Sequence, residues 1–242
     1  MAHVLVTGSA GAIGRPTCAE LRAGGHAVRG FDLRATPDVD ESVVGDIAER
    51  EAVSNAVRGV DAVVHLAAIP NDAPFAELVG PNVLGVHHVL EAARASGVRR
   101  VVLASTIQTV GQLSRERRVT IDDRAPGNHY ALTKVWLEEM GALAARLHGL
   151  EIVAPRIAWV VRNPVEAARM DELRAYDLYL SPRDAGRFFR SAVEAPVTAF
   201  SLMFLAGPEC ERRFDLEPAR RFGFESRDRF PDGLPFVAER TA

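Results

Sequence analysis

The chain has 242 residues, a mass of 26.3 kDa and an almost balanced charge, with 29 lysines and arginines against 32 aspartates and glutamates. A net charge of -3 gives no positive field that would attract nucleic acid or an anionic membrane, so the expected partner is a small molecule. The length suits one α/β domain with a small appendage and excludes two full domains.

Cysteine usage and the N-terminal residues bear on the compartment. Cys18 and Cys210 are too few for a disulfide framework and lack the clustered histidines of a zinc site, so we expect reduced thiols and no metal. The N-terminus enters an apolar strand without the regions of a signal peptide, and no apolar run approaches the length of a membrane span. These features predict a cytoplasmic protein without a membrane partner.

Short β-branched runs alternate with amphipathic helical patterns through the first two thirds of the chain. Strands are expected at 3–8, 27–33, 62–68, 100–106 and 151–157, with helical patterns between them, as at 83–97. Such alternation predicts βαβ units, and hence an α/β fold whose parallel sheet is covered by helices on both faces.

The alternation ends near residue 160. A helix is expected at 182–195 and a short apolar run at 199–206, followed by a turn-rich C-terminus. We therefore divide the chain into a core at 1–160 and a small segment at 161–242 that caps the carboxyl edge of the sheet. Both parts are expected to form one compact unit.

The stretch TGSAGAIG places Gly8, Gly11 and Gly14 between the first strand and the first helix. Glycines allow the backbone to approach a pyrophosphate, and the following helix N-terminus offers unpaired N–H groups. The spacing is GxxGxxG, not the GxGxxG of the best-known dinucleotide fingerprint, and glycines also end strands for structural reasons. Its position in the first βα turn favours a dinucleotide loop.

Asp32 ends the second strand, where a carboxylate can accept hydrogen bonds from both adenosine ribose hydroxyls. Such a carboxylate repels a 2'-phosphate, which favours NAD over NADP, although Arg34 could stack on adenine or meet a phosphate. Asp46 follows an expected third strand and could bind the adenine amino group. The small residues of HLAAIP, 65–70, would let the backbone lie along the cofactor phosphates, and His65 itself is interpreted as a buried strand residue.

Tyr130 and Lys134 lie one helical turn apart in the stretch HYALTKVWLE. Spacing alone does not make them a catalytic pair, because any residues at i and i+4 are neighbours on a helix. Beside a nicotinamide cofactor they acquire roles, since a lysine ammonium can stabilise a tyrosinate that takes a proton from an alcohol. Lys134 can also hold the nicotinamide ribose, and a hydroxyl of Ser105 or Thr106 would orient the substrate oxygen.

The chain resembles the extended short-chain dehydrogenase/reductase superfamily, also called the NAD-dependent epimerase/dehydratase family. The motifs TGSAGAIG, GDI, HLAA, LAST and YALTK, with Asp32 and Asn82, occur in the family's order. The resemblance implies a Rossmann-like doubly wound parallel sheet, NAD as cofactor and a catalytic Ser/Thr, Tyr and Lys set. The cofactor site would then comprise Gly8, Gly11, Ala12, Ile13, Gly14, Asp32, Leu33, Arg34, Asp46, Ile47, Leu66, Ala67, Ala68, Asn82, Tyr130, Lys134 and Ile157.

The family's spacing selects the catalytic hydroxyl, which stands five residues before a glycine. Counting back from Gly111 gives Thr106, with Ser105 as the second choice. Within the family, the chain most resembles the uronate dehydrogenases, in which an arginine matching Arg169 binds the substrate carboxylate. Other substrate positions depart from that group, which has more polar residues there. The implied substrate site is Pro70, Thr106, Ile107, Gln108, Tyr130 and Arg169.

The resemblance predicts an NAD-dependent oxidoreductase acting on a small polyhydroxylated alcohol, lactol or sugar acid. The short segment after residue 160 suits a substrate of monosaccharide size or smaller. Two alternatives are an epimerase that retains its NAD and a non-catalytic NAD-binding regulator. Apolar residues beyond one core face at 83–95 and 135–147 predict a homodimer, whereas Trp136 and Met140 could instead pack inside one chain.

Overall fold

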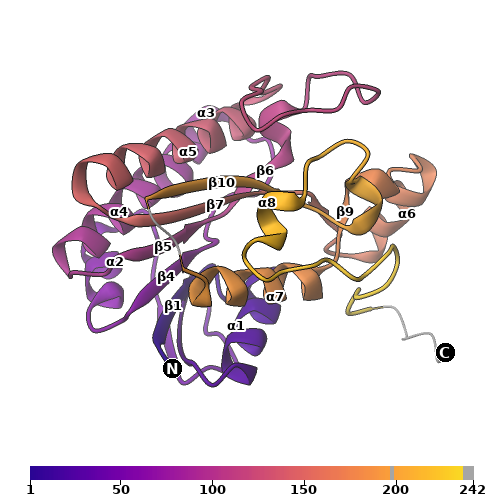
Figure 1. Ribbon diagram of the computed structural model, residues 1–242. Coiled ribbons are helices and arrows are strands. Elements are labelled where there is room, and N and C mark those ends of the chain that lie inside the picture. Colours follow the sequence, from indigo (N-terminus) through magenta and orange to yellow (C-terminus); the bar gives the residue numbers. More distant parts are fainter. Residues whose placement is uncertain (197–198, 237–242) are drawn as a thin grey trace.

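A parallel sheet of eight strands forms the centre of the molecule (Figure 1). The computed structural model describes residues 1–196 and 199–236. Seven strands follow the order β10-β7-β5-β4-β1-β2-β3, and the short β6 also pairs with β7. The strands are β1 (His3–Thr7), β2 (Ala27–Asp32), β3 (Glu41–Val44), β4 (Ala62–His65), β5 (Arg100–Leu103), β6 (Ser105–Thr106), β7 (Glu151–Ile157) and β10 (Phe200–Leu205).

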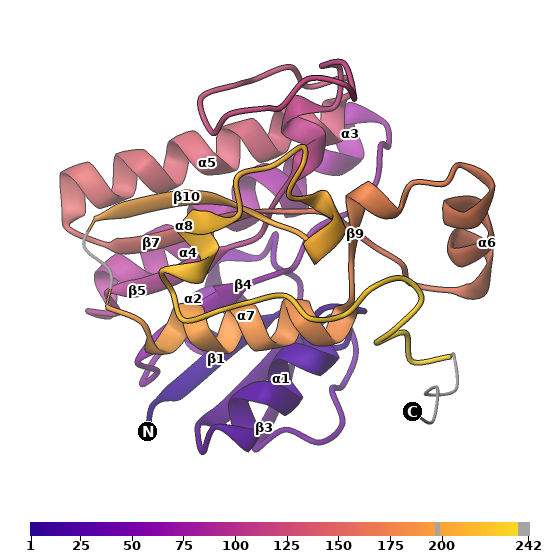
Figure 2. The same ribbon diagram turned by 45° about the vertical axis from the view of Figure 1, so that its right-hand side comes forward.

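Helices cover both faces of the sheet. On one face α1 (Gly14–Ala23) lies beside α7 (Pro182–Glu194), and on the other lie α2 (Arg50–Val57), α4 (Gly85–Ala95) and α5 (His129–His148) (Figures 1 and 2). The close approach of α7 to α1 requires a glycine at 186, because a Cβ there would lie 2.7 Å from the Pro16 carbonyl oxygen. This is the doubly wound architecture that the sequence predicts.

The side chains of β1 alternate between two apolar cores. Val4 and Val6 pack with Phe188 of α7, whereas Leu5 packs with Val89 of α4 on the opposite face. A strand that is buried on both faces needs an unbroken apolar run, which is why this strand appears in the sequence without polar alternation. Each fully buried side chain of this size contributes about 1.5–3 kcal/mol to folding.

Shorter elements complete the chain. β8 (Trp159–Val160) and β9 (Tyr179–Leu180) form a separate parallel pair, and α6 (Pro164–Glu172) stands out beside it (Figure 2). No helix in the described ranges is long and apolar enough to cross a membrane. The remaining short elements are α3 (Phe75–Leu78), the π-helix η1 (Val79–Leu84), the 3₁₀ turns η2 (Ile107–Val110), η3 (Tyr176–Leu178) and η4 (Pro208–Cys210), and α8 (Glu217–Arg220).

The expected strands are confirmed with one break, because 100–106 forms β5 and β6 on either side of Ala104. The apolar run at 199–206 was expected in a cap, but its residues 200–205 form β10, which pairs with β7 as an edge strand. The helix expected at 182–195 is α7. The division at residue 160 stays a proposal about function. α7 and β10, which follow this residue, belong to the helices that cover the sheet and to the sheet itself. Residues 197–198 and 237–242 of that segment lie outside the described residues.

Candidate active site

A cavity of about 970 Å³ opens at the carboxyl ends of the strands, between the first βα turn and the start of α5. Ligands of open α/β sheets bind at this edge, where the strand order reverses, and here β1 lies between β2 and β4. Most residues predicted for the site line it. They are Gly8, Gly11, Ala12, Ile13, Gly14, Asp32, Leu33, Asp46, Ile47, Leu66, Ala67, Ala68, Pro70, Thr106, Ile107, Gln108, Tyr130, Lys134, Ile157 and Arg169.

Two glycines of the loop, Gly8 and Gly14, have no room for a side chain. Gly8 has a φ of +69°, and a Cβ there would lie 2.7 Å from the Ala67 nitrogen, while a Cβ at Gly14 would lie 2.1 Å from the Gly8 carbonyl oxygen. No described side chain caps α1, whose N-cap is Ile13. The Arg15 N–H donates to the Gly11 carbonyl oxygen and Pro16 has no N–H, so among the described residues the N–H groups of Ala12, Ile13 and Gly14 remain for an anion, as a pyrophosphate site requires.

The Asp32 carboxylate is held by two backbone N–H groups at the end of β2. Ala10 donates to Oδ2 over 3.1 Å and Arg34 donates to Oδ1 over 3.3 Å. The exposed Leu33 lines the cavity beside Asp32, and Asp46 lines it from beyond β3. This geometry places carboxylates where the sequence predicts the adenosine half of a dinucleotide.

Two residues predicted to contact the cofactor, Arg34 and Asn82, lie outside the cavity lining. The Arg34 side chain is exposed. The buried Asn82 accepts a hydrogen bond from the Ile69 backbone N–H over 2.8 Å and donates to the Ile69 carbonyl oxygen over 3.1 Å. Asn82 thus fixes the loop that follows β4, and its neighbour Ile69 faces the cavity.

Thr106, Tyr130 and Lys134 are buried together where β6 meets the first turns of α5. Asn128 caps this helix by accepting a hydrogen bond from the Ala131 N–H over 2.7 Å, which fixes the position of Tyr130. The Thr106 side chain lies near enough to the Tyr130 hydroxyl to lower its pKa as a hydrogen-bonding neighbour. Lys134 Nζ lies 5.9 Å from the Tyr130 ring centre and donates to the Ala104 carbonyl oxygen over 2.8 Å.

Burial dominates the titration of this group. It raises the pKa of Tyr130 to about 12, against the lowering effects of the Thr106 hydrogen bond and the Arg162 charge. Burial also lowers the pKa of Lys134 to about 8. The Lys134 ammonium is directed at the Ala104 carbonyl oxygen, and the effects that lower the Tyr130 pKa come from Thr106 and Arg162. The expected effect of Lys134 on the tyrosine pKa stays a prediction.

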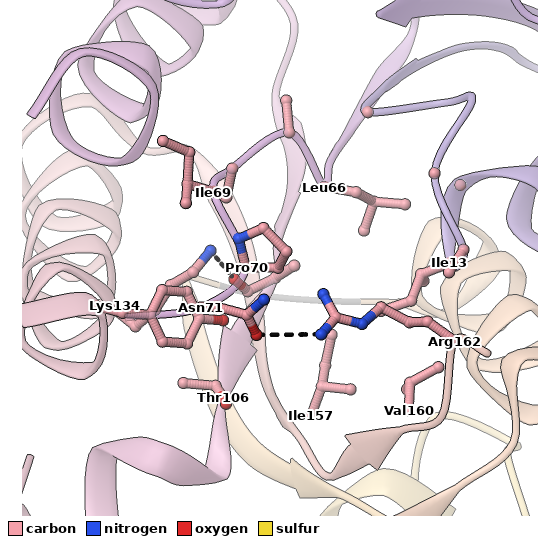
Figure 3. A pocket seen from close by; sticks show the side chains of 18 of the residues that line it. Ile13, Leu66, Ile69, Pro70, Asn71, Thr106, Lys134, Ile157, Val160 and Arg162 are labelled. Atoms are coloured by element: carbon pink, nitrogen blue, oxygen red, sulfur yellow. Dashed lines mark hydrogen bonds between the residues drawn. The ribbon is translucent and has the colours of Figure 1, made fainter. Parts of the chain in front are cut away.

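Four polar residues that were not predicted from the sequence also line the cavity: Asn71, Glu77, Arg162 and Glu166. Figure 3 shows the Arg162 guanidinium pointing at Asn71 across the cavity. A signal for two of them was present in the sequence, because Asn163 and Glu166 form a helix N-cap box before α6, with Arg162 next to it.

A buried ion pair lies behind Thr106. Arg156 of β7 donates to Glu138 of α5 over 2.8 and 2.9 Å, and both side chains are fully buried. Ser105 also donates to Glu138, over 2.6 Å, so the second choice for the catalytic hydroxyl already has a structural partner.

The other titratable candidates have structural roles. His65 is buried and hydrogen-bonded to Thr7 over 2.8 Å, which confirms its interpretation as a strand residue. Burial, with a further contribution from the Lys134 charge, lowers the pKa of His65 to about 3. Cys18 and Cys210 are buried free thiols. Within the described ranges, no three His, Cys, Asp or Glu side chains are arranged to hold a metal.

Known proteins resemble this chain in sequence and fold. Residues 4–161 match the model of the NAD dependent epimerase/dehydratase family. Uronate dehydrogenase of Pseudomonas syringae pv. tomato is 31% identical over 207 residues, covering 84% of this chain and 73% of that protein. L-arabinose 1-dehydrogenase (NAD(P)(+)) of Haloferax volcanii is 34% identical over 249 residues, covering 94% and 97%.

A solved structure is similar over nearly the whole chain. A mutant uronate dehydrogenase from Agrobacterium tumefaciens, complexed with NAD, matches with a TM-score of 0.81 at 26% identity. The match covers 93% of this chain and 84% of that chain. The similarity therefore extends beyond the glycine loop to α7 and β10.

Proposed function

The chain belongs to the NAD dependent epimerase/dehydratase family and is an NAD-dependent enzyme, and we propose that it oxidises a hydroxyl group of a small sugar, sugar acid or related lactol. One observation carries this proposal. A single cavity joins the glycine loop and Asp32 to Thr106 and Tyr130. A dinucleotide in it would have its adenosine half at Asp32 and its nicotinamide at the catalytic residues.

The residues present fit NAD. Glycines at 8 and 14 let the loop fold back closely on the backbone, where a Cβ would clash, and the uncapped start of α1 lies beside it. Asp32, held by two backbone N–H groups, can accept both ribose hydroxyls and repels a 2'-phosphate. Together these groups support NAD over NADP.

The proposed chemistry divides among three side chains. Thr106 orients the reacting hydroxyl, and Tyr130 takes its proton as general base. Lys134 stabilises the tyrosinate and holds the nicotinamide ribose. When bound, NAD accepts the hydride and adds its positive ring charge to those that favour the tyrosinate. Because burial raises the pKa of Tyr130 to about 12, these charges have to lower it before proton transfer occurs near neutral pH.

A substrate of monosaccharide size is supported by the relatives and by the site. The two curated relatives described above are named for the oxidation of uronates and of L-arabinose. The substrate end of the cavity is enclosed by the β8–α6 segment, through Trp159, Val160 and Leu173, and by Pro70 of the loop after β4. These residues form the walls of the substrate end and support a small substrate.

The test is to mix purified protein with NAD and a panel of uronic acids, aldoses and cyclitols. NADH formed in proportion to the substrate consumed would support a dehydrogenase. An isomerised sugar without net NADH would indicate the alternative of an epimerase that retains its cofactor. Binding of NAD without turnover of any compound would indicate a regulatory protein and contradict the proposal.

We further propose a homodimer in the cytoplasm. Support for the dimer comes from the apolar residues on the outer faces of α4 and α5, where Leu84, Leu143 and Leu147 are between 44% and 61% exposed. Trp136 is 37% exposed and contacts Phe75, so it is only partly covered within one chain. Two free thiols support a reducing compartment.

A further inference from the structure

Arg162 projects into the substrate end of the cavity and is held there by two partners. Its Nη2 donates to Asn71 Oδ1 over 3.1 Å and to Glu166 Oε1 over 2.5 Å, and its Nε donates to the same carboxylate over 2.9 Å. Figure 3 shows its guanidinium among the apolar side chains of Leu66, Pro70 and Ile157, pointing at Asn71. The three polar residues therefore form one bridge across an apolar wall.

The bridge lies close to the proposed reaction centre. Arg162, Glu166 and Asn71 line the same cavity as Thr106 and Tyr130. The charge of Arg162 also lowers the pKa of Tyr130. A substrate whose hydroxyl reaches Thr106 and Tyr130 would therefore place its far end against this bridge.

Glu166 compensates the charge of Arg162. Besides the guanidinium contacts, its Oε2 accepts the Arg162 backbone N–H over 2.9 Å. The side chains of the pair are 33% and 17% exposed. Burial raises the pKa of Glu166, but the hydrogen bonds from Arg162 outweigh it and keep the carboxyl below its usual range. Both members of the pair are thus charged, and the pair has no net charge.

The bridge retains unused hydrogen-bonding capacity. Within residues 1–196 and 199–236, Arg162 Nη1 and Asn71 Nδ2 have no hydrogen-bond partner. Asn71 Oδ1 and Glu166 Oε2 each accept one bond from Arg162 and can accept another, whereas Glu166 Oε1 already accepts two. Sugar hydroxyls both donate and accept, so a pair of adjacent hydroxyls matches donors and acceptors placed side by side. A carboxylate only accepts, and it would lie beside the negative charge of Glu166.

We propose that Arg162 and Glu166 form a specificity pair that binds hydroxyls of an uncharged aldose, held as its cyclic lactol. The inference rests on the proposed oxidation of a sugar hydroxyl and narrows its substrate class to neutral sugars. Arg169, which the resemblance assigns to a substrate carboxylate, lies exposed on α6, and Glu77 lines the same cavity as Glu166. A carboxylate in this cavity would therefore meet two glutamates as well as the arginines.

Matched sugar pairs test the proposal directly. Galactose and galacturonate, or glucose and glucuronate, differ only in a hydroxymethyl group against a carboxylate. With NAD and wild-type protein, we expect the aldose of each pair to have the higher kcat/KM. A uronate preferred in both pairs would overturn the inference while leaving the proposed dehydrogenase intact. Failure to oxidise any sugar of either class would contradict the proposed function, and the inference with it.

Two variants separate specificity from structural damage. Glu166→Gln removes the negative charge but keeps the shape, so the ratio of uronate to aldose kcat/KM should rise about 10- to 100-fold, the range of one hydrogen bond to a charged group. Arg162→Leu should lower aldose kcat/KM by a similar factor while the Kd for NAD, measured by calorimetry, stays unchanged. Equal changes for aldose and uronate in Glu166→Gln would show a structural role only and overturn the proposal.

A matched control is available on α7. Arg190 and Glu194 form another i,i+4 pair with an Nε to Oε1 distance of 2.9 Å, the two arginines are similarly exposed, and neither Arg190 nor Glu194 lines the cavity. Arg190→Leu should leave the aldose to uronate ratio as in the wild type. If this variant changed the ratio as much as Arg162→Leu does, the effect would not be specific to the cavity and the proposal would fail.

Discussion

Tyr130 is the residue on which the proposed proton transfer depends. Tyr130→Phe keeps the ring in its buried place and removes only the hydroxyl, so turnover should fall by about 10²- to 10⁴-fold, the range for loss of a general base. Steady-state kinetics measures turnover, and an NAD titration measures cofactor binding separately. Tyr176→Phe is the control, since Tyr176 lies outside the cavity lining and bonds Asp171. Undiminished turnover in Tyr130→Phe would contradict the mechanism.

Lys134 gives the stability of the cofactor-free protein a definite pH dependence. Burial lowers the pKa of Lys134 from 10.5 to about 8. Between these values the unfolded chain binds the proton that the folded chain has lost, so the contribution of Lys134 to stability rises with pH, by at most about 3 kcal/mol.

The measurement is urea unfolding of wild type and Lys134→Met from pH 7 to about 10. The stability of the wild type relative to the variant should increase across the upper part of this range. A difference that stays constant would show that the lysine keeps its ordinary pKa in the folded state. Stopping near pH 10 avoids the opposite contribution of Tyr130, whose raised pKa makes stability fall as pH rises from about 10 to about 12.

At single positions, the sequence predicted residues whose roles depend on local geometry. Glycines at a βα turn and a tyrosine one turn before a lysine indicate their roles by their spacing along the chain. Arg162 and Asn71 do not, because their contact joins loops 91 residues apart. The site departs from the prediction where such long-range contacts determine what faces the cavity.

Among the elements, β10 is the strand whose place in the fold could not be predicted from the sequence. An apolar run of six to eight residues does not reveal whether it will pair with a sheet or cover one. The partner of β10 is β7, which lies far earlier in the chain, and only the folded sheet brings them together. The strands of the regular βα alternation were predictable because each element there is followed by its own crossover helix.

The docking of α5 on the sheet depends on the buried pair of Glu138 and Arg156. Glu138→Gln would leave the Arg156 guanidinium buried without a countercharge, which should lower the free energy of unfolding by about 3–5 kcal/mol. Thermal or denaturant unfolding measures this change, with Glu139→Gln, on the exposed side of the same helix, as the control. Equal stability of the two variants would show that the buried pair contributes nothing.

The whole molecule presents an apolar surface on the side opposite α1 and α7. Leu143 and Leu147 of α5 share a face with Trp136, and Leu84 at the start of α4 is also exposed. α4 and α5 lie side by side in the fold, so these residues can form one continuous surface (Figure 1). A second copy related by a two-fold axis would cover the same residues on both chains.

Leu143→Glu tests this dimer with little risk to the fold, because the side chain is 44% exposed in one chain and exposed substitutions usually change stability by at most about 0.5 kcal/mol. Two glutamates facing each other across a two-fold axis would be desolvated and mutually repelled, so the variant should sediment as a monomer where the wild type sediments as a dimer. Val165→Glu is the matched control, since Val165 is 79% exposed on α6, away from α4 and α5. A monomeric wild type, or a dimer that persists in Leu143→Glu, would show that this surface is not the interface.

Tyr130 and Lys134 begin the same helix as Leu143. Where the position of α5 depends on the partner chain, loss of the dimer should lower kcat in parallel with dissociation.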